Sequence, residues 1–262
     1  MPLFSSRQAT PGTLAPPSSP AVRGVTNGPR FHDPGAVGNA LGARVRPISA
    51  RRDRLLPLLA PLAPLFPDGG LQRGTVIAVD VADGTHAASG TGPTGPGAGG
   101  ATTLAFALLA AASATGSWCA AVGTADPGML SMAELGVDLS RLALVPHPGP
   151  AWAEVTAALL DGMDAVLTLP PWPARLWVAH RLAARARERQ AVLIVLSCRS
   201  WWPEGPEIRL VVRGGVWHGV GQGHGHLQGR RVKVVTTGRR VAVRPVSTDL
   251  WLPAPSGAVA LA

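Results

Sequence analysis

The chain has 262 residues, which is enough for one α/β domain with tails or for two small domains. Hydrophobic residues make up 46% of it, which indicates a folded core, whereas 32 glycines and 26 prolines favour long irregular stretches as well. No apolar run reaches the roughly 18 residues of a membrane span, and the start of the chain lacks a secretory pattern. Cys119 and Cys198 lie in apolar runs and are expected to be buried thiols. This excludes a disulfide framework or a zinc cluster and favours a cytoplasmic location.

Charge is distributed unevenly along the chain, whose net charge is +9. Residues 1–54 carry eight arginines against two acids, and residues 55–208 carry eight arginines against twelve acids. Residues 209–244 carry seven arginines and one lysine with no acid. Such a basic segment suits nucleic acid or an acidic protein partner, although the arginine bias of a GC-rich genome would explain it equally.

The first 206 residues divide into a tail and a core. Residues 1–47 are rich in Ser, Pro, Gly and Thr, so we expect a disordered tail. Leucines interrupted by prolines between residues 55 and 67 predict short turns at a domain edge. The expected strands are then 74–79, 118–122, 142–145, 165–169 and 191–196, and the expected helices are 102–114, 129–135, 152–160 and 174–188. This alternation predicts an α/β core over residues 48–206, a mostly parallel sheet flanked by helices.

The C-terminal part has strands without helices. Apolar and basic residues alternate in the expected strands 208–212, 228–236 and 240–245, and Thr237–Gly238 supplies a hairpin turn. We expect a basic, β-rich antiparallel extension of the sheet over residues 207–254. Residues 255–262 are expected to form a second disordered tail.

The loop after the first core strand has the position of a phosphate-binding loop, whose pattern is Gly-x4-Gly-Lys-[Ser/Thr] at a helix N-terminus. Its glycines and hydroxyl residues are in place: Gly95, Gly99, Gly100, Thr102 and Thr103. Ala101 stands where the pattern needs lysine, and the only lysine in the chain is Lys233. No ammonium group is therefore available there to neutralise the β- and γ-phosphates of a nucleotide.

Other groups that ATP hydrolysis requires are missing too. The strand 165–169 ends in Thr168 and Leu169 where an acid would hold magnesium, and Asp164 stands at its opposite end. Near the end of the second core strand, Asp126 is the only carboxylate. We therefore predict a degenerate phosphate loop and expect no catalytic residue, no metal site and no cofactor. The helix that follows has Thr102 or Thr103 available as its N-cap.

Three segments resemble the RecA-like core. Gly69–Gly74 is similar to the entry to the first core strand of that superfamily, and Gly99–Ala105 lies where its Gly-Lys-Thr-Thr-Leu-Ala segment falls. Asp126–Leu142 is similar to a recombinase stretch that runs from Asp-Pro through Leu-Gly-Val-Asp to an apolar strand. This resemblance covers about residues 68–200 and implies a RecA-like fold.

The chain resembles more closely the actinobacterial ImuA-prime proteins, which are degenerate RecA homologues. The similar segments are 152–155, 181–189, 217–227, 230–234 and 249–253. This resemblance implies a non-catalytic accessory in translesion synthesis induced by DNA damage. Its partners would be an ImuB-type Y-family polymerase homologue and an error-prone C-family DNA polymerase.

Eight tryptophans and no tyrosine make the aromatic content unusual. Trp172, Trp201 and Trp202 follow predicted strands, at the edge where parallel sheets bind ligands. They are candidates for stacking on single-stranded DNA or for anchoring a protein partner, and ordinary half-buried packing is the alternative. Three others are expected in the core: Trp118, Trp152 and Trp177.

The basic C-terminal strands hold the remaining candidate contacts to DNA or to an acidic partner. These are Arg230, Arg231, Lys233, Arg239 and Arg240. Along a strand, Arg231 and Lys233 share one face and Arg230 lies on the other, so a solvated strand pair is the alternative.

The nearby histidines stand among glycines, so we expect a solvated turn and not a metal site: His218, His224 and His226.

Two other functions remain open. One is a genuine DNA-dependent, recombinase-like ATPase, in which Arg73 or an arginine of a neighbouring molecule replaces the missing lysine. The other is a module that binds single-stranded DNA without polymerase partners.

Overall fold

The computed structural model describes residues 54–81, 100–125, 127–197, 202–203, 205–221, 224–239 and 245–262. All of them lie in one compact unit, which runs from Leu41 to Ala262. The tail expected at residues 1–47 lies outside the described residues.

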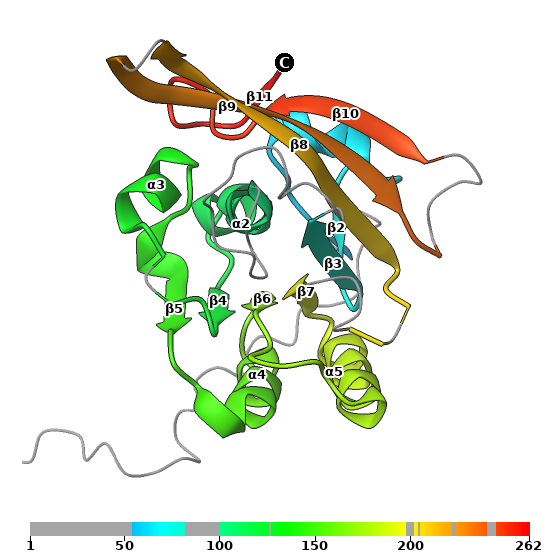
Figure 1. Cartoon of the computed structure of the whole chain (residues 1–262). Coiled ribbons are helices and arrows are strands. Elements are labelled where there is room, and N and C mark those ends of the chain that lie inside the picture. Colours follow the sequence, from blue (N-terminus) through cyan, green and yellow to red (C-terminus); the bar gives the residue numbers. More distant parts are fainter. Residues whose placement is uncertain are drawn as a thin grey trace, which may run out of the picture. The chain divides into compact units, whose positions relative to one another are not determined.

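Nine strands of the described residues form one sheet (Figure 1). In spatial order they are β11 (Ala260–Leu261), β10 (Val246–Trp251), β9 (His224–Thr237), β8 (Ile208–Gly221), β3 (Val76–Val81), β7 (Val192–Ser197), β6 (Ala165–Thr168), β4 (Cys119–Val122) and β5 (Leu142–Val145). The pairings from β8 to β5 are parallel, and those from β8 to β11 are antiparallel. The predicted mostly parallel α/β sheet with an antiparallel C-terminal extension is therefore confirmed.

The central parallel strands are buried on both faces. Every residue of β4, β6 and β7 is buried, as is typical of strands covered by helices on both sides. β3 lies between β7 and β8, so β7 and β6 separate it from β4, the next parallel strand along the chain. This order differs from that of the dinucleotide-binding fold, in which those two strands are neighbours.

Helices cover both faces of the parallel strands (Figure 1). One face carries α2 (Ala101–Ala114) and α3 (Met129–Glu134), and the other carries α4 (Trp152–Leu160) and α5 (Leu176–Arg189). Successive strand residues divide between two cores, as the period of a strand requires. Ala121 and Leu167 pack in the core that contains α2, whereas Ala120 and Val166 pack in the core that contains α4 and α5.

Short elements complete the core. β1 (Leu55–Leu56) pairs with β2 (Leu71–Gln72), and the 3₁₀ helix η2 (Ala60–Leu65) lies between them in sequence. Leu62 and Leu65 of η2 are buried, which confirms the expected apolar turns. Two further 3₁₀ helices, η4 (Leu139–Arg141) and η5 (Gly149–Ala151), precede β5 and α4.

The strands and helices expected between residues 74 and 196 are confirmed, each with ends within two residues of the prediction. The predicted N-cap is wrong, because α2 begins after Gly100, which has a φ of 96° and provides no side-chain cap. Neither Thr102 nor Thr103 is the capping residue, since both lie inside the helix.

The C-terminal strands are longer than predicted. β8 and β9 each have 14 residues and form one hairpin, whose register shifts between Arg213 and Val216 and again between His218 and Val220. Of the strand expected at 240–245, residues 240–244 lie outside the described part, and β10 is the strand that pairs with β9. The disordered tail expected at 255–262 is wrong. The chain turns back at Gly257 and ends in β11, which pairs with β10.

No helix in the described part of the chain has the length and apolar character needed to cross a membrane.

Candidate functional site

The predicted degenerate phosphate loop falls in the segment that joins the end of β3 to the start of α2. Gly95 and Gly99 lie outside the described residues, whereas Gly100 is the N-cap of α2 and Thr102 and Thr103 are half-buried in its first turn. Ala101, the residue in place of lysine, is fully buried. The first turn of α2 therefore presents a buried methyl group where a phosphate loop has its cation.

Lys233 does not compensate for this substitution. It lies on β9 between Val232 and Val234, which are buried in the core that contains α2. Because side chains alternate along a strand, Lys233 points to the other face, where its Nζ lies 3.9 Å from Asp249 Oδ2. The only ammonium side chain of the protein is thus directed away from α2.

Arg230 points inward, as the alternation along β9 predicts, and approaches α2. A Cβ placed on Gly100 would lie 3.6 Å from Arg230 Nη1. The guanidinium lies over the ring of Trp217 at 5.6 Å, and its buried Nε has no hydrogen-bond partner in the described part of the chain. Burial lowers the pKa of Arg230, and no carboxylate of the described residues pairs with it.

The shift in register along β8 makes room for this side chain. Gly215 has a φ of 139°, and a Cβ there would overlap the guanidinium of Arg230. The backbone conformation favours glycine at this position, and any side chain there would displace the guanidinium of Arg230. The approach of Arg230 to α2 therefore depends on the glycine-rich segment of the hairpin.

Arg73 lies at the other end of the sheet, so it cannot replace the lysine, contrary to one of the open alternatives. It precedes β3, and its Nη1 forms an ion pair with Asp164 Oδ1 at 2.8 Å. Asp164 precedes β6, as predicted, and its Oδ2 accepts a hydrogen bond of 2.9 Å from the N–H of Trp118. Both residues therefore connect the amino ends of parallel strands, whereas the phosphate loop follows a carboxyl end.

The carboxyl end of β6 carries no acid that could hold magnesium. Thr168 is buried there, and its hydroxyl lies 3.2 Å from that of Thr156 on α4. Asp126, the other expected carboxylate, lies outside the described residues.

One buried acid near the carboxyl edge was not identified from the sequence. Asp80 of β3 is 1% exposed, pairs with Arg209 of β8 and accepts a hydrogen bond of 3.2 Å from Ser197 of β7. Its position as the one acid within the apolar strand β3 could have identified it from the sequence. Because its charge is neutralised by Arg209, Asp80 connects three strands and does not present a free carboxylate.

The tryptophans are distributed differently from the prediction. Trp202 is 2% exposed and belongs to the core, so its ring is not available for stacking on a base. Trp201 lies outside the described residues. Trp172 is 46% exposed, as a contact residue should be. Trp118 and Trp177 were expected in the core, but they are 41% and 58% exposed, whereas Trp152 is buried as predicted.

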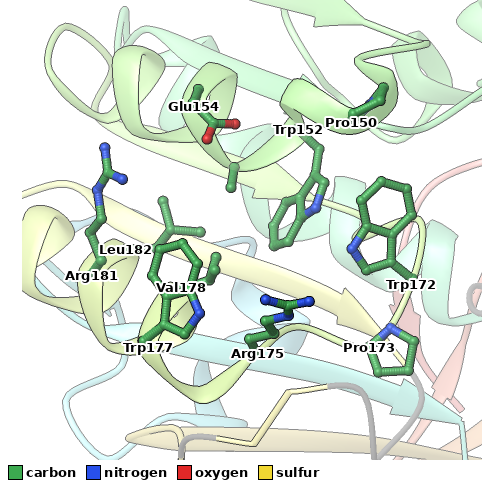
Figure 2. A pocket seen from close by; sticks show the side chains of 11 residues that line it. Pro150, Trp152, Glu154, Trp172, Pro173, Arg175, Trp177, Val178, Arg181 and Leu182 are labelled. Atoms are coloured by element: carbon green, nitrogen blue, oxygen red, sulfur yellow. The ribbon is translucent and has the colours of Figure 1, made fainter.

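A groove with a volume of about 440 Å³ lies between the first turns of α4 and α5 (Figure 2). We call it the aromatic groove and define it by Trp152, Trp172, Pro173, Arg175, Trp177 and Arg181. In the view of Figure 2, the guanidinium of Arg175 lies between the rings of Trp172 and Trp177. Of this set, only Trp172 was predicted as a contact residue, because Trp152 and Trp177 were expected in the core and the two arginines belong to no recognisable motif.

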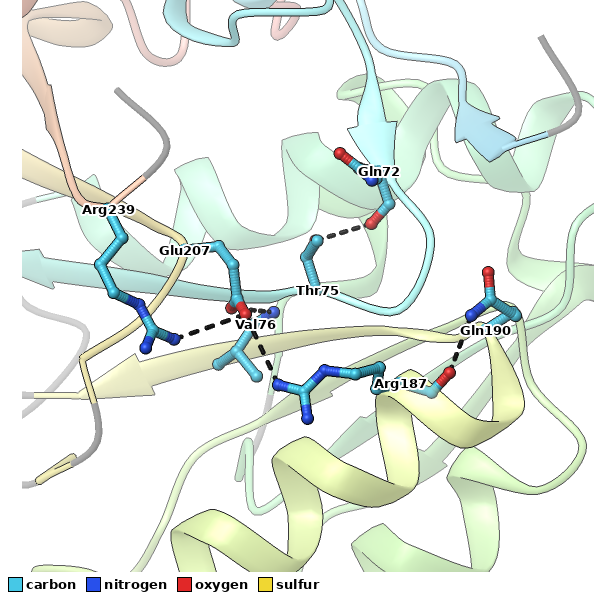
Figure 3. A network of polar contacts seen from close by, with 7 residues as sticks. All are labelled: Gln72, Thr75, Val76, Arg187, Gln190, Glu207 and Arg239. Atoms are coloured by element: carbon cyan, nitrogen blue, oxygen red, sulfur yellow. Dashed lines mark hydrogen bonds and ion pairs between the residues drawn. The ribbon is translucent and has the colours of Figure 1, made fainter. Parts of the chain in front are cut away.

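The basic strand β9 is only partly free for contacts. Arg231 and Lys233 are exposed on one face, as predicted. Arg239, at the end of the hairpin, lies 3.5 Å from Glu207 Oε1, and Arg240 lies outside the described residues. Glu207 also accepts a hydrogen bond of 2.9 Å from the N–H of Val76 and lies 3.8 Å from Arg187 (Figure 3). Arg239 thus takes part in a network that holds the start of β3.

The three histidines of the hairpin lie on strands and not in a turn. His218 belongs to β8, and His224 and His226 belong to β9; all three are exposed. His218 packs edge-on against Trp251, with ring centroids 4.8 Å apart. Among the residues that the structure describes, no group of three or more His, Cys, Asp or Glu side chains is placed to hold a metal ion.

Part of the chain is similar to known sequences. Residues 94–204 match a family model described as the MT3502 N-terminal domain. The uncharacterized protein Rv3395c of Mycobacterium tuberculosis is 40% identical over 115 residues, which are 44% of this chain and 55% of that protein. The chain therefore spans little more than half the length of this relative. The segment that matches the family model contains α2 to α5 and the aromatic groove, whereas the hairpin with Arg230 follows it.

Proposed function

We propose that the protein is a non-catalytic, RecA-like accessory of translesion synthesis induced by DNA damage, which acts as an adaptor for DNA polymerases in the cytoplasm. The observation that carries this proposal is the start of α2, where Ala101 is buried in place of the phosphate-binding lysine and Lys233 points away. The absence of an acid at the carboxyl end of β6 supports it. The mycobacterial relative is consistent with the resemblance to actinobacterial ImuA-prime proteins.

The partners of this adaptor would be an ImuB-type Y-family polymerase homologue and an error-prone C-family polymerase. The test is capture of these polymerases from damaged cells by the tagged full-length chain, together with an ATPase assay with and without single-stranded DNA. We expect capture of at least one polymerase and no ATP turnover. ATP hydrolysis that copurifies with the chain and is lost on substitution of Arg230 would overturn the non-catalytic role.

A second candidate function is nucleotide binding at a non-standard site, as in the ATPase alternative. The observation in its favour is Arg230, whose unpaired guanidinium approaches the N-cap of α2. A helix N-terminus and a cation together attract an anion. Titration with a fluorescent ATP analogue tests this function. Binding that Arg230→Ala abolishes and that Arg213→Ala, on the same hairpin, leaves intact would support it.

Single-stranded DNA is a further partner that the exposed face of β9 suits. Arg231 and Lys233 lie on this face and would neutralise phosphates. Binding of an oligonucleotide through them should weaken steeply as salt is raised, because bound counterions are released. Affinity that stayed constant between low and moderate salt would contradict this role.

A further inference from the structure

Large apolar side chains in and beside the aromatic groove are exposed to solvent. Trp172 and Trp177 are 46% and 58% exposed, and the neighbouring Leu176 is 52% exposed. Trp152 forms the buried wall between the two helices. Clusters of exposed aromatic side chains on a rigid scaffold are typical of surfaces that bind another molecule.

The arginines of the groove differ from the other arginines of α5. Arg185 and Arg189 form ion pairs with Asp161, and Arg187 lies near Glu207. Within the described residues, neither Arg175 nor Arg181 has such a pair. The groove thus holds two unpaired cations, and Glu154 is the acid that lines it.

The position of Arg175 favours an anion at the same place. Arg175 is the N-cap residue of α5 and provides no side-chain cap to the first N–H groups of this 14-residue helix. Acidic or hydroxyl side chains are usual at such a position, and a cation there is disfavoured by the helix dipole. A carboxylate supplied by another molecule would satisfy both the first turn of α5 and the guanidinium groups.

We propose that the aromatic groove binds a peptide segment of a partner protein in which carboxylates flank a bulky apolar side chain. The volume of about 440 Å³ suits one or two such side chains. Nucleic acid is a poorer fit, because a strand carries a charge at every phosphate and the groove offers two cations beside Glu154. This inference deepens the proposed function and rests on it for the source of the peptide, a DNA polymerase of the translesion complex.

Selection from a display library of random twelve-residue peptides tests the groove itself, with the full-length chain as bait. We expect enriched peptides that combine Asp or Glu with Trp, Phe or Leu. Trp177→Ala and Arg181→Glu should each weaken their binding by about tenfold or more, as is usual for anchors of an interface. Trp118→Ala and Arg213→Glu are matched controls elsewhere on the surface and should leave the affinity unchanged. Failure to enrich such peptides, or equal binding by all four variants, would overturn the proposal.

A labelled oligothymidine serves as the competing probe. Its binding should be insensitive to Trp177→Ala. If the oligonucleotide requires Trp177 and no peptide is selected, the occupant is nucleic acid and the proposal is wrong.

Capture of the polymerases distinguishes the adaptor role of the protein from the peptide-binding role of the aromatic groove. If the wild-type chain captures neither polymerase but selects acidic, apolar peptides, the adaptor role fails and the groove is still a peptide site. If the wild-type and Trp177→Ala chains capture a polymerase equally, the adaptor role holds and the groove is not its docking site.

Discussion

The amino and carboxyl edges of the parallel sheet differ in how their charged side chains are paired. At the amino edge, carboxylates of Asp161, Asp164 and Glu207 each pair with at least one arginine, and two of them also accept backbone hydrogen bonds. At the carboxyl edge, Arg175 and Arg230 have no carboxylate partner among the described residues, and Trp172 is exposed. Carboxylate–arginine pairs therefore stabilise the amino edge, whereas the carboxyl edge, apart from the buried Asp80–Arg209 pair, keeps cations available for binding, as is usual in parallel sheets.

The largest expected effect comes from breaking the amino edge at Glu207. Glu207→Ala removes the acceptor of the Val76 N–H and leaves Arg187 and Arg239 without their carboxylate. We expect the free energy of unfolding to fall by about 1–3 kcal/mol, because a largely buried donor loses its partner. Urea denaturation measures this change. Glu188→Ala, on the exposed face of α5, is the control, and an equal loss in both variants would contradict the structural role of Glu207.

A smaller effect concerns the pH dependence of stability. The hydrogen bond from Arg185 lowers the pKa of Asp161 below its usual value. A carboxyl group with a lowered pKa in the folded state stabilises the protein above its unfolded pKa of about 3.9, and this contribution disappears as the pH falls through the folded value. The free energy of unfolding of the wild type should therefore decrease more steeply below about pH 4 than that of Asp161→Asn. Parallel curves for the two proteins would exclude this contribution.

At the carboxyl edge, removal of a cation should cost little. Arg230→Met removes a partly desolvated guanidinium whose Nε has no hydrogen-bond partner among the described residues, together with its contact with Trp217. We expect the free energy of unfolding to change by less than about 1 kcal/mol, because removal of a partly buried, unpaired cation offsets the lost cation–π contact. The same substitution at Arg73, whose pair with Asp164 belongs to the amino edge, should cost more. A larger loss of stability in Arg230→Met than in Arg73→Met would contradict the contrast between the two edges.

The last prediction concerns Cys119, the first residue of β4 at the amino edge, whose thiol should not react in the folded protein. Burial raises the pKa of its thiol to about 12, with a further contribution from Asp164. Since only the thiolate reacts, a Cys198→Ser chain should not react with a thiol reagent at pH 8 until it unfolds. Labelling of the folded variant at the rate of a free thiol would show that this edge opens.

Much of the parallel core could be predicted from local sequence. The apolar runs of β4, β6 and β7 and the helical segments between them have ends within two residues of the prediction. The β8–β9 hairpin was predicted less well, because residues 213–227 are rich in glycine and their ladder depends on register shifts. The tail at 255–262 was mistaken for disorder, since β11 has only two residues and is stabilised by pairing with β10.

The candidate sites were predictable to a smaller extent. Trp202 was expected to be exposed and is buried, whereas Trp177 was expected in the core and is exposed. The side of α5 that meets the sheet decides the exposure of Trp177, and packing in the core that contains α4 and α5 buries Trp202. Arg175 and Arg181 were not identified because the groove forms only where their segment lies beside Trp152 of α4.

By itself, the sequence determined the alternation of strands and helices and the absence of a lysine at position 101, since both can be read from neighbouring residues. The tertiary structure decided that Lys233 points away from α2, that Arg230 approaches it and that two helix starts enclose a groove. Such contacts join residues far apart in the chain. They depend on how the crossover connections place strands beside one another, which local periodicity does not encode.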